Sequence, residues 1–379
     1  MTGKRIDLVD ALRGYALLGL FIVHCVERFE VYWFNPQPDA WFDGVFALFG
    51  SKAFAIFALL FGFSFATIME NERARGADFS FRFAWRLVLL LAIGTLHVVF
   101  YRGDILQVLA VVGLLLIPLD RVRSDRVLLF LAALALVQLP LWWRWWAAGQ
   151  GAEWATATPL YMTWGNLQAL AEGSALAVAL DNLGPGTVGK WSYYLETGRV
   201  AEIVGLFMVG MVLHRRKMFA QAEEHRLVWV AIAAVSAVLW MFAQALPPAF
   251  GSEAQRQSAE WLLGQARALP AMGFQVAVFV LLWQGPVRGL LQVLVPAGRM
   301  TLTLYVGQSI VGVWLLYGYG LGLWDEISNA EAVLWGLAAF ALQAVLAAWW
   351  FRHYRYGPLE WAWRAATRTT TAVPFRQTA

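Results

Sequence analysis

About ten apolar stretches, each long enough to cross a bilayer, limit what this chain can fold into. Hydrophobic residues make up 60% of the 379 residues and charged residues only 14%, which excludes an ordinary soluble domain. Within lipid such stretches must be helical, because only a helix satisfies its own backbone. The sequence therefore predicts an all-α, polytopic membrane protein with a single transmembrane domain over residues 1–379. The stretches lie at residues 12–33, 52–70, 83–101, 104–120, 126–147, 200–214, 226–246, 269–285, 299–319 and 332–351.

Lysines and arginines concentrate in alternate connections between these stretches, for example at residues 121–126 and 215–217. By the positive-inside rule these connections face the cytoplasm, which predicts an even number of spans with both termini cytoplasmic. The longest connection, 149–199, then faces outward as a loop or cap, and residues 352–379 form a cytoplasmic tail with an interfacial helix. Since the net charge of +4 resides in these connections, it indicates membrane orientation and not nucleic-acid binding.

The first stretch carries two ionisable side chains, Arg13 and His24, eleven residues apart. At about 1.5 Å of rise per residue, a helix separates them by roughly 16 Å, half the hydrocarbon thickness. A titratable group at that depth is costly, so a functional role is expected. The alternative is an arginine that starts a helix and a histidine satisfied by a neighbouring helix.

The third stretch repeats this spacing, with Arg86 and His97 again eleven residues apart. Both stretches are predicted to run outward, so the two imidazoles lie at similar depth. Asp104 follows His97 closely and is placed to orient an imidazole in acid–base chemistry. The alternative role for Asp104 is to cap the next helix, and the two roles are compatible.

Three arginines, Arg13, Arg86 and Arg299, begin spans from the predicted cytoplasmic side. Guanidinium groups at one level suit the phosphates of a nucleotide-like donor or of lipid headgroups.

Three further polar residues, Lys52, Gln308 and Ser309, are candidate substrate-binding groups. Lys52 opens the second stretch from the outer side, where the alternative is simple snorkelling to the headgroups. Gln308 and Ser309 fall near the depth of the histidines and either tie helices together or contact a substrate.

Standard catalytic motifs are missing from the sequence. It contains no phosphate-binding glycine loop, no dinucleotide pattern, no HExxH, no Gly-x-Ser-x-Gly and no Cys/His metal spacing, and Cys25 is the single cysteine. No metal is therefore expected. Acyl transfer assisted by one histidine needs few residues and fits this inventory.

Five segments carry a resemblance to a known family: RIDLVDALRGYALLGLFIVH, KAFAIFALLFGFSFA, RLVLLLAIGTLHVVFYRGDIL, GRMTLTLYVGQS and GPLEWAWR. They resemble the YeiB-like family of bacterial multipass membrane proteins, a domain-of-unknown-function family. That family is similar to a group of transmembrane acyltransferases that includes the acyltransferase-3 proteins and the lysosomal heparan N-acetyltransferase. In acyltransferase-3 proteins an arginine and a histidine on the first helix, with ten residues between them, form the signature site, and Arg13 and His24 match that spacing. YeiB-like proteins more usually have asparagine at the position of His24, whereas His97 and residues 103–106 are typical of them. This departure favours His97, with Asp104, over His24 as the catalytic histidine.

The resemblance implies a bacterial inner-membrane acyltransferase that moves an acyl group from a cytoplasmic acyl-CoA-type donor to a hydroxyl or amine. The acceptor is an envelope sugar, a lipid or a small molecule. His24 or His97 is the expected general base, and the three arginines would hold the donor phosphates. Membrane lipids are the expected partners, and a homo-oligomer is compatible with this interpretation. The alternative functions are a non-catalytic transporter or channel that uses the same buried groups, and a receptor or assembly partner.

Overall fold

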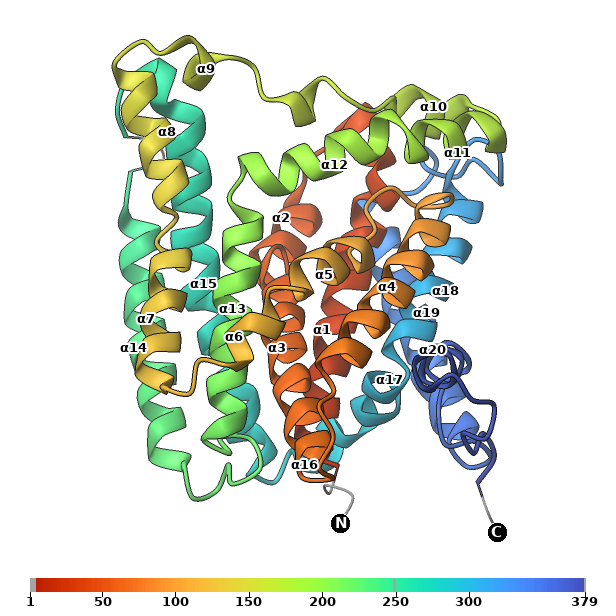
Figure 1. Cartoon of the computed structure of the whole chain (residues 1–379). Helices are drawn as coiled ribbons and strands as arrows, with labels where there is room; N and C mark the ends of the chain where they lie inside the picture. The colour runs from red at the N-terminus through yellow and green to blue at the C-terminus, as the bar shows by residue number, and fades with distance from the viewer. Residues whose placement is uncertain (1–4, 248–249, 378–379) are drawn as a thin grey trace.

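The computed structural model describes residues 5–247 and 250–377, and these residues form a helical bundle (Figure 1). Within them the only extended pairing is an isolated bridge between Tyr354 and Arg376, so the predicted all-α class is confirmed. The chain enters the first helix and leaves the last at the same end of the bundle, here called the terminal end (Figure 1). The opposite end, covered by the long connection, is called the loop end.

Seven helical segments of the described chain are long and apolar enough to cross a membrane. They are α1 (Asp7–Val26) continued by η1 (Arg28–Phe34), α2 (Ala40–Leu48) with α3 (Lys52–Arg73), α4 (Ser80–Val98), α7 (Asp125–Leu136) with α8 (Leu139–Gly149), α14 (Arg226–Ala245), η3 (Glu253–Gln255) with α15 (Arg256–Trp283), and α19 (Asn329–Trp350). Two bent pairs raise the number to nine. They are α12 (Pro185–Glu196) with α13 (Arg199–Arg215), bent by 64°, and α16 (Arg288–Leu291), η4 (Gln292–Leu294) and α17 (Val295–Arg299) with α18 (Thr301–Leu316), bent by 79°.

The described chain thus has up to nine candidate spans, whereas the sequence predicts about ten. The predicted stretch at residues 104–120 accounts for this difference. It forms two short helices, α5 (Leu106–Gly113) and α6 (Leu116–Asp120), neither of which is long enough to span alone. The chain nevertheless returns to the terminal end here. The ion pair between Asp120 and Arg73, at the end of α3 (2.5 Å), shows this return. The start of α1 and the last described residues lie at one end (Figure 1), which agrees with an even number of passes, while the cytoplasmic orientation of that end stays a prediction.

The long connection is ordered in short helices across the loop end (Figure 1). They are α9 (Glu153–Thr156), η2 (Leu160–Met162), α10 (Leu167–Glu172), α11 (Ala175–Leu183) and α12. Side-chain caps define the starts of two of them, since Asn166 accepts from the backbone of α10 and Ser174 from that of α11. These helices form a cap over the bundle, here called the loop-end cap.

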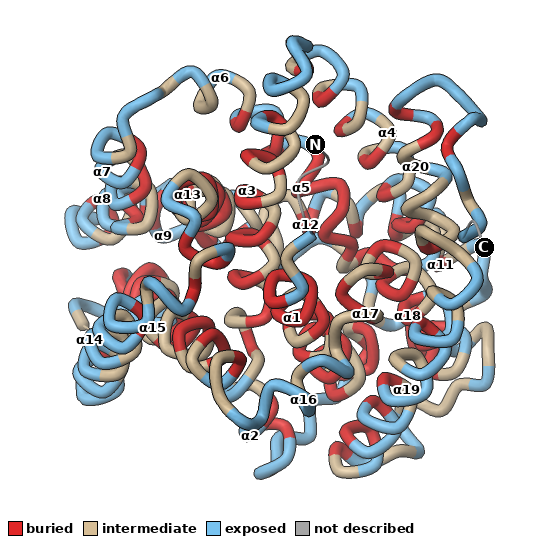
Figure 2. Tube along the Cα trace, turned by 90° about the horizontal axis from the view of Figure 1, so that it is seen from below, coloured by how far each residue is buried: buried red, intermediate tan, exposed pale blue. Residues whose placement is uncertain are grey.

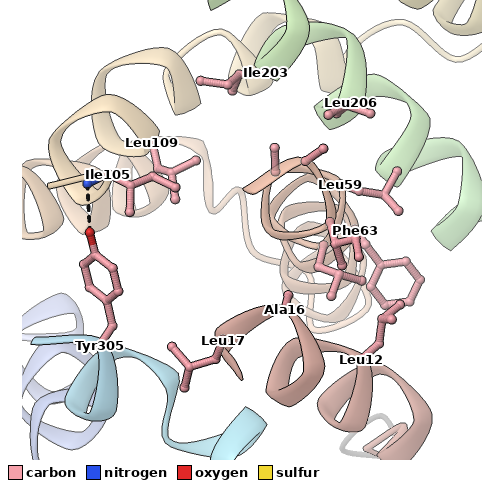
Figure 3. Packing of buried hydrophobic residues seen from close by; sticks show 14 of the residues in the cluster. Leu12, Ala16, Leu17, Leu59, Phe63, Ile105, Leu109, Ile203, Leu206 and Tyr305 are labelled. Atoms are coloured by element: carbon pink, nitrogen blue, oxygen red, sulfur yellow. Dashed lines mark hydrogen bonds between the residues drawn. The ribbon is translucent and has the colours of Figure 1, made fainter. Parts of the chain in front are cut away.

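Burial identifies α1 as the central helix. Figure 2 shows α1 surrounded by other helices, with α14 and α19 at the periphery. Its spanning window is 72% buried, against 11% for α14, so α14 presents most of its apolar surface to lipid. The core around α1 joins Leu12 and Leu17 to Leu59 and Phe63 of α3 (Figure 3).

Glycines allow two helix pairs to approach backbone to backbone. A Cβ on Gly298 of α17 would lie 1.7 Å from the carbonyl oxygen of Asp10 in α1. A Cβ on Gly210 of α13 would lie 2.0 Å from the carbonyl oxygen of Leu59 in α3. Close packing of this kind replaces the hydrophobic effect as the force between membrane helices.

The tail helix α20 (Pro358–Arg368) is attached to the bundle by Glu360. Its carboxylate accepts from the backbone N–H groups of Leu302 (2.7 Å) and Thr303 (3.1 Å) and from the Thr303 hydroxyl (2.6 Å). Glu360 therefore caps the start of α18 from another helix.

We expect Glu360→Ala to lower the free energy of unfolding by about 1–2 kcal/mol, because α18 loses its N-terminal cap. Thermal unfolding in detergent measures the change, and limited proteolysis should cut α20 faster. Glu326→Ala, at an exposed position of the loop end, is the control and should unfold like the wild type. An unchanged unfolding temperature for Glu360→Ala would contradict the capping role.

Candidate active site

The two predicted histidines lie in one cluster, towards the loop end of the bundle. His24 of α1 and His97 of α4 share two aromatic neighbours. The ring of Tyr101 lies 5.2 Å from that of His24 and 6.0 Å from that of His97. The ring of Tyr305, in α18, lies 6.5 Å from His24 and 5.3 Å from His97. Three of the predicted stretches thus bring their polar groups to the same place.

His97 is hydrogen-bonded to the predicted carboxylate. Its Nδ1 lies 2.8 Å from Oδ1 of Asp104, and both residues are buried. The other oxygen of Asp104 accepts the backbone N–H of Gln107 (2.9 Å) in the first turn of α5. Asp104 therefore contacts both the imidazole and the first turn of α5, the two contacts considered from the sequence, while its part in catalysis stays a prediction.

This hydrogen bond determines which nitrogen of His97 can act as a base. A carboxylate at Nδ1 favours the tautomer with its proton there, so Nε2 keeps a lone pair. Nε2 is buried and has no hydrogen-bond partner among the described residues. Because its lone pair is not used by another described residue, Nε2 is free to accept a proton from a group bound beside it.

The two tyrosines of the cluster were not predicted as site residues. The hydroxyl of Tyr101 lies 3.0 Å from Nδ1 of His24. The hydroxyl of Tyr305 accepts the backbone N–H of Ile105 (3.2 Å), as Figure 3 shows. The sequence does give a signal for each. Tyr101 opens the polar YRGD segment before Asp104, and Tyr305 stands one turn before Gln308.

A second carboxylate, Glu30, lies beside the tyrosines. A Cβ on Gly103 would lie 2.4 Å from Oε1 of Glu30 and 2.3 Å from the hydroxyl of Tyr101, so this close approach requires a glycine. Sequence reasoning missed Glu30 because it lies near the outer end of the predicted stretch 12–33, where a carboxylate is normally solvated at the membrane interface.

The loop-end cap contacts the cluster through two cations. Arg102 donates to the carbonyl of Asn166 (3.0 Å) and lies 3.4 Å from Asp181, and its Nε is buried without a partner in the described chain. Lys190 of α12 is buried and donates to the side chain of Gln107. The cap thus encloses the polar cluster.

The three predicted phosphate-binding arginines lie away from the histidines, at the terminal end. Arg13 donates to Asp10 (2.7 Å) and to Ser64 (2.6 Å). The Arg86 guanidinium lies 3.5 Å from the ring centroid of Trp363, and that of Arg299 lies 4.1 Å from the ring of Phe351. Nε of Arg299 is buried and unpartnered among the described residues.

The other three candidates bond to neighbouring backbone or helices. Lys52 donates to the carbonyl of Phe46 (3.0 Å), and Ser309 to that of Tyr305 in its own helix (3.1 Å). Gln308 donates to the side chain of Gln343 on α19 (2.7 Å), which ties α18 to α19. In the described residues, no group of three or more His, Cys, Asp or Glu side chains is placed to hold a metal ion.

Comparison with known proteins supports the resemblance found in the sequence. Residues 5–168 match the family model described as heparan-alpha-glucosaminide N-acetyltransferase, catalytic. Residues 213–370 match the model described as a protein of unknown function, DUF418. The uncharacterized protein YxaH of Bacillus subtilis is 29% identical over 97% of this chain and 95% of its own length. The uncharacterized protein YeiB of Escherichia coli is 26% identical over 95% of this chain and 95% of its own length.

The first of these matches covers most of the polar cluster. His24, His97 and Asp104 all lie within residues 5–168, whereas Tyr305 and Arg299 lie within residues 213–370. The cluster is therefore assembled where the region similar to an acetyltransferase catalytic domain meets α18 from the second region.

Proposed function

We propose that this chain, a relative of the YeiB-like membrane proteins, is an acyltransferase that uses His97 as its general base. It takes an acyl group from an acyl-CoA-type donor and transfers it to a hydroxyl or amine. The observation that carries the proposal is the His97–Asp104 pair, whose Nε2 is buried and unpartnered. The match to an acetyltransferase catalytic domain over the same residues supports it.

The residues of the cluster have definite roles in this reaction. Nε2 of His97 takes the proton of the acceptor as its oxygen or nitrogen attacks the thioester carbonyl. Asp104 stabilises the imidazolium that forms. The tetrahedral intermediate then breaks its C–S bond, and the leaving thiolate recovers the proton. Tyr305 accepts from Ile105, which leaves its own hydroxyl proton to donate to the developing oxyanion.

The donor is proposed to bind from the terminal end, with its phosphates at Arg13, Arg86 and Arg299. Eleven residues of α1 separate Arg13 from His24, roughly 16 Å of helix. A donor therefore needs a long, narrow arm to carry its thioester from the arginines to the histidines. The terminal end would be cytoplasmic in the cytoplasmic membrane of a bacterium, as the charge distribution and the bacterial relatives suggest.

A direct test measures thiol release from acetyl-CoA by the purified protein with a panel of sugars, amines and glycerophospholipids. We expect turnover with at least one acceptor. Thermal stabilisation by acyl-CoA, without any acceptor, checks the donor separately. If no donor gave either turnover or thermal stabilisation, the proposal would be refuted.

We expect Arg299→Gln to raise the KM for acyl-CoA about tenfold with little change in kcat, because it removes a phosphate contact made equally in ground and transition states. Steady-state thiol release measures both constants. Arg352→Gln, an exposed arginine of the tail, is the matched control and should leave the KM unchanged. A KM unaffected by Arg299→Gln would remove this residue from the donor site.

A transporter is the second candidate function, because two of the spans are bent pairs. The 79° bend before α18 and the 64° bend before α13 resemble the discontinuous helices of transporters. Solute uptake into proteoliposomes, without any thiol release from acyl-CoA, would favour this alternative.

A further inference from the structure

A groove lies beside the histidine cluster, between α1, α18 and α19. Its volume is about 120 Å³, and it is here called the lateral groove. Its lining is mostly apolar and includes Phe21, Cys25, Phe29, Gly312, Trp335 and Ala339. None of the roles assigned above uses this space.

The lateral groove opens on the outer surface of the bundle. Val311 on α18 and Trp335 on α19 line it and are 58% and 47% exposed, as expected for side chains that face hydrocarbon. The groove is therefore continuous with the membrane-facing surface of these two spans. Its polar side chains Gln308 and Gln343 are bonded to each other, so the remaining lining suits a hydrocarbon chain.

Phe29 forms a common wall between the lateral groove and the histidine cluster. Its ring lines the groove and lies 5.7 Å from the ring of His24 and 5.3 Å from that of Tyr101. The ring sits in a notch at Gly312, where a Cβ would come within 2.1 Å of it. One aromatic side chain thus lies between the lateral groove and two residues of the histidine cluster, His24 and Tyr101.

The backbone that carries Phe29 is strained and held in place. Arg28, Phe29 and Glu30 have φ values of 47°, 52° and 83°, an unfavourable run for residues other than glycine. Arg28 is buried and donates to the carbonyls of Val26, Trp324 and Ile327 and to Asn329. The Tyr317 hydroxyl donates to the carbonyl of Phe29 (2.7 Å). These contacts fix where Phe29 and Glu30 point, and strain maintained in this way is typical of functional sites.

We propose that the lateral groove binds the hydrocarbon chain of a membrane lipid whose headgroup is the acyl acceptor, with Phe29 as the fixed wall between the chain and the histidine cluster. A chain in the groove lies along α18 and α19 and places the headgroup at the level of Phe29, next to His24 and Tyr101. This inference rests on the proposed acyltransferase function and narrows its acceptor to a lipid.

The binding test uses a phosphatidylglycerol with a photoreactive diazirine in one acyl chain, added to the purified full chain in detergent. We expect adducts on peptides of α1, α18 and α19 that line the groove. Ala339→Phe fills the groove and should lower this labelling about tenfold, the effect of roughly two lost methylene contacts. Ala338→Phe adds the same bulk at an exposed position of the same helix and should label like the wild type.

A second variant, Val311→Trp, fills the groove from its exposed rim and should lower the labelling as well. It keeps the test valid if Ala339→Phe fails to fold. Equal labelling in wild type, Ala339→Phe and Val311→Trp would overturn the proposal. Unlabelled dioleoyl phosphatidylglycerol should compete with the probe, whereas glycerophosphoglycerol should not. Competition by oleoyl-CoA in place of the phospholipid would also overturn it, because the groove would then hold the chain of the donor.

Labelling does not require turnover, so the two proposals fail separately. His97→Gln should be labelled like the wild type while it loses acyl transfer. Groove labelling in a protein that never turns over acyl-CoA would refute the acyltransferase alone. Turnover with a soluble acceptor but no groove labelling would refute the lipid site alone.

Discussion

His97→Gln is expected to lower kcat for acyl transfer by about 10²- to 10⁴-fold, the usual contribution of a positioned general base. Glutamine keeps a polar group near Asp104 but has no basic nitrogen to take the proton of the acceptor. Thiol release at saturating acyl-CoA measures the effect. The KM for the donor should change little, because His97 lies far from the three arginines.

Three further variants separate catalysis from folding and identify the base. His353→Gln changes an exposed histidine of the tail and should keep full activity. Asp104→Asn should also lower kcat strongly, because an amide no longer favours the Nδ1–H tautomer of His97. Full activity of His97→Gln, in protein with the unfolding temperature of the wild type, would contradict the mechanism. Loss of activity only in His24→Gln would assign the base to the first helix.

Gly298→Ala is expected to destabilise the bundle by about 1–3 kcal/mol or more, the usual effect of overpacking. Its Cβ would meet the backbone oxygen of Asp10 at 1.7 Å, and a backbone atom cannot rotate away as a side chain can. The helices α1 and α17 must then separate. Thermal unfolding in detergent measures the loss.

Gly307→Ala is the matched control for this prediction. Gly307 lies in α18, and a Cβ there would meet no atom within 4 Å. We expect its stability to be unchanged or slightly higher, since alanine favours a helix. Equal unfolding temperatures for Gly298→Ala and Gly307→Ala would show that α1 and α17 tolerate separation.

Helix positions could be predicted from the sequence where one apolar run corresponds to one span, as in α4 and α14. The prediction was less accurate where apolar length and helix length differ. Residues 104–120 are apolar throughout but divide into α5 and α6. In contrast, α15 begins at Arg256, thirteen residues before its predicted start, and continues through Pro270. The first part of α15 contains polar residues and so has no apolar run to predict it. A helix can continue there because the loop end extends beyond the hydrocarbon region.

The site could be predicted only in part for a related reason. The equal spacing of Arg13–His24 and Arg86–His97 predicted two imidazoles at one depth, and the structure places them in one cluster. Depth along a helix follows from counting residues, whereas the direction of a side chain around the bundle does not. Tyr305 from α18 and Lys190 from the loop-end cap join the cluster through tertiary packing, which the spacing in one helix cannot reveal.

The double role of Asp104 affects how the protein would respond to heat. The same carboxylate orients His97 and closes the first turn of α5, a helix of only eight residues. Seven of the eight residues of α5 are buried, so its first turn has little freedom to open separately from the bundle. The imidazole of His97 should therefore stay oriented until this packing is lost. On warming, any acyl-transfer activity should persist up to the temperature at which the bundle itself unfolds.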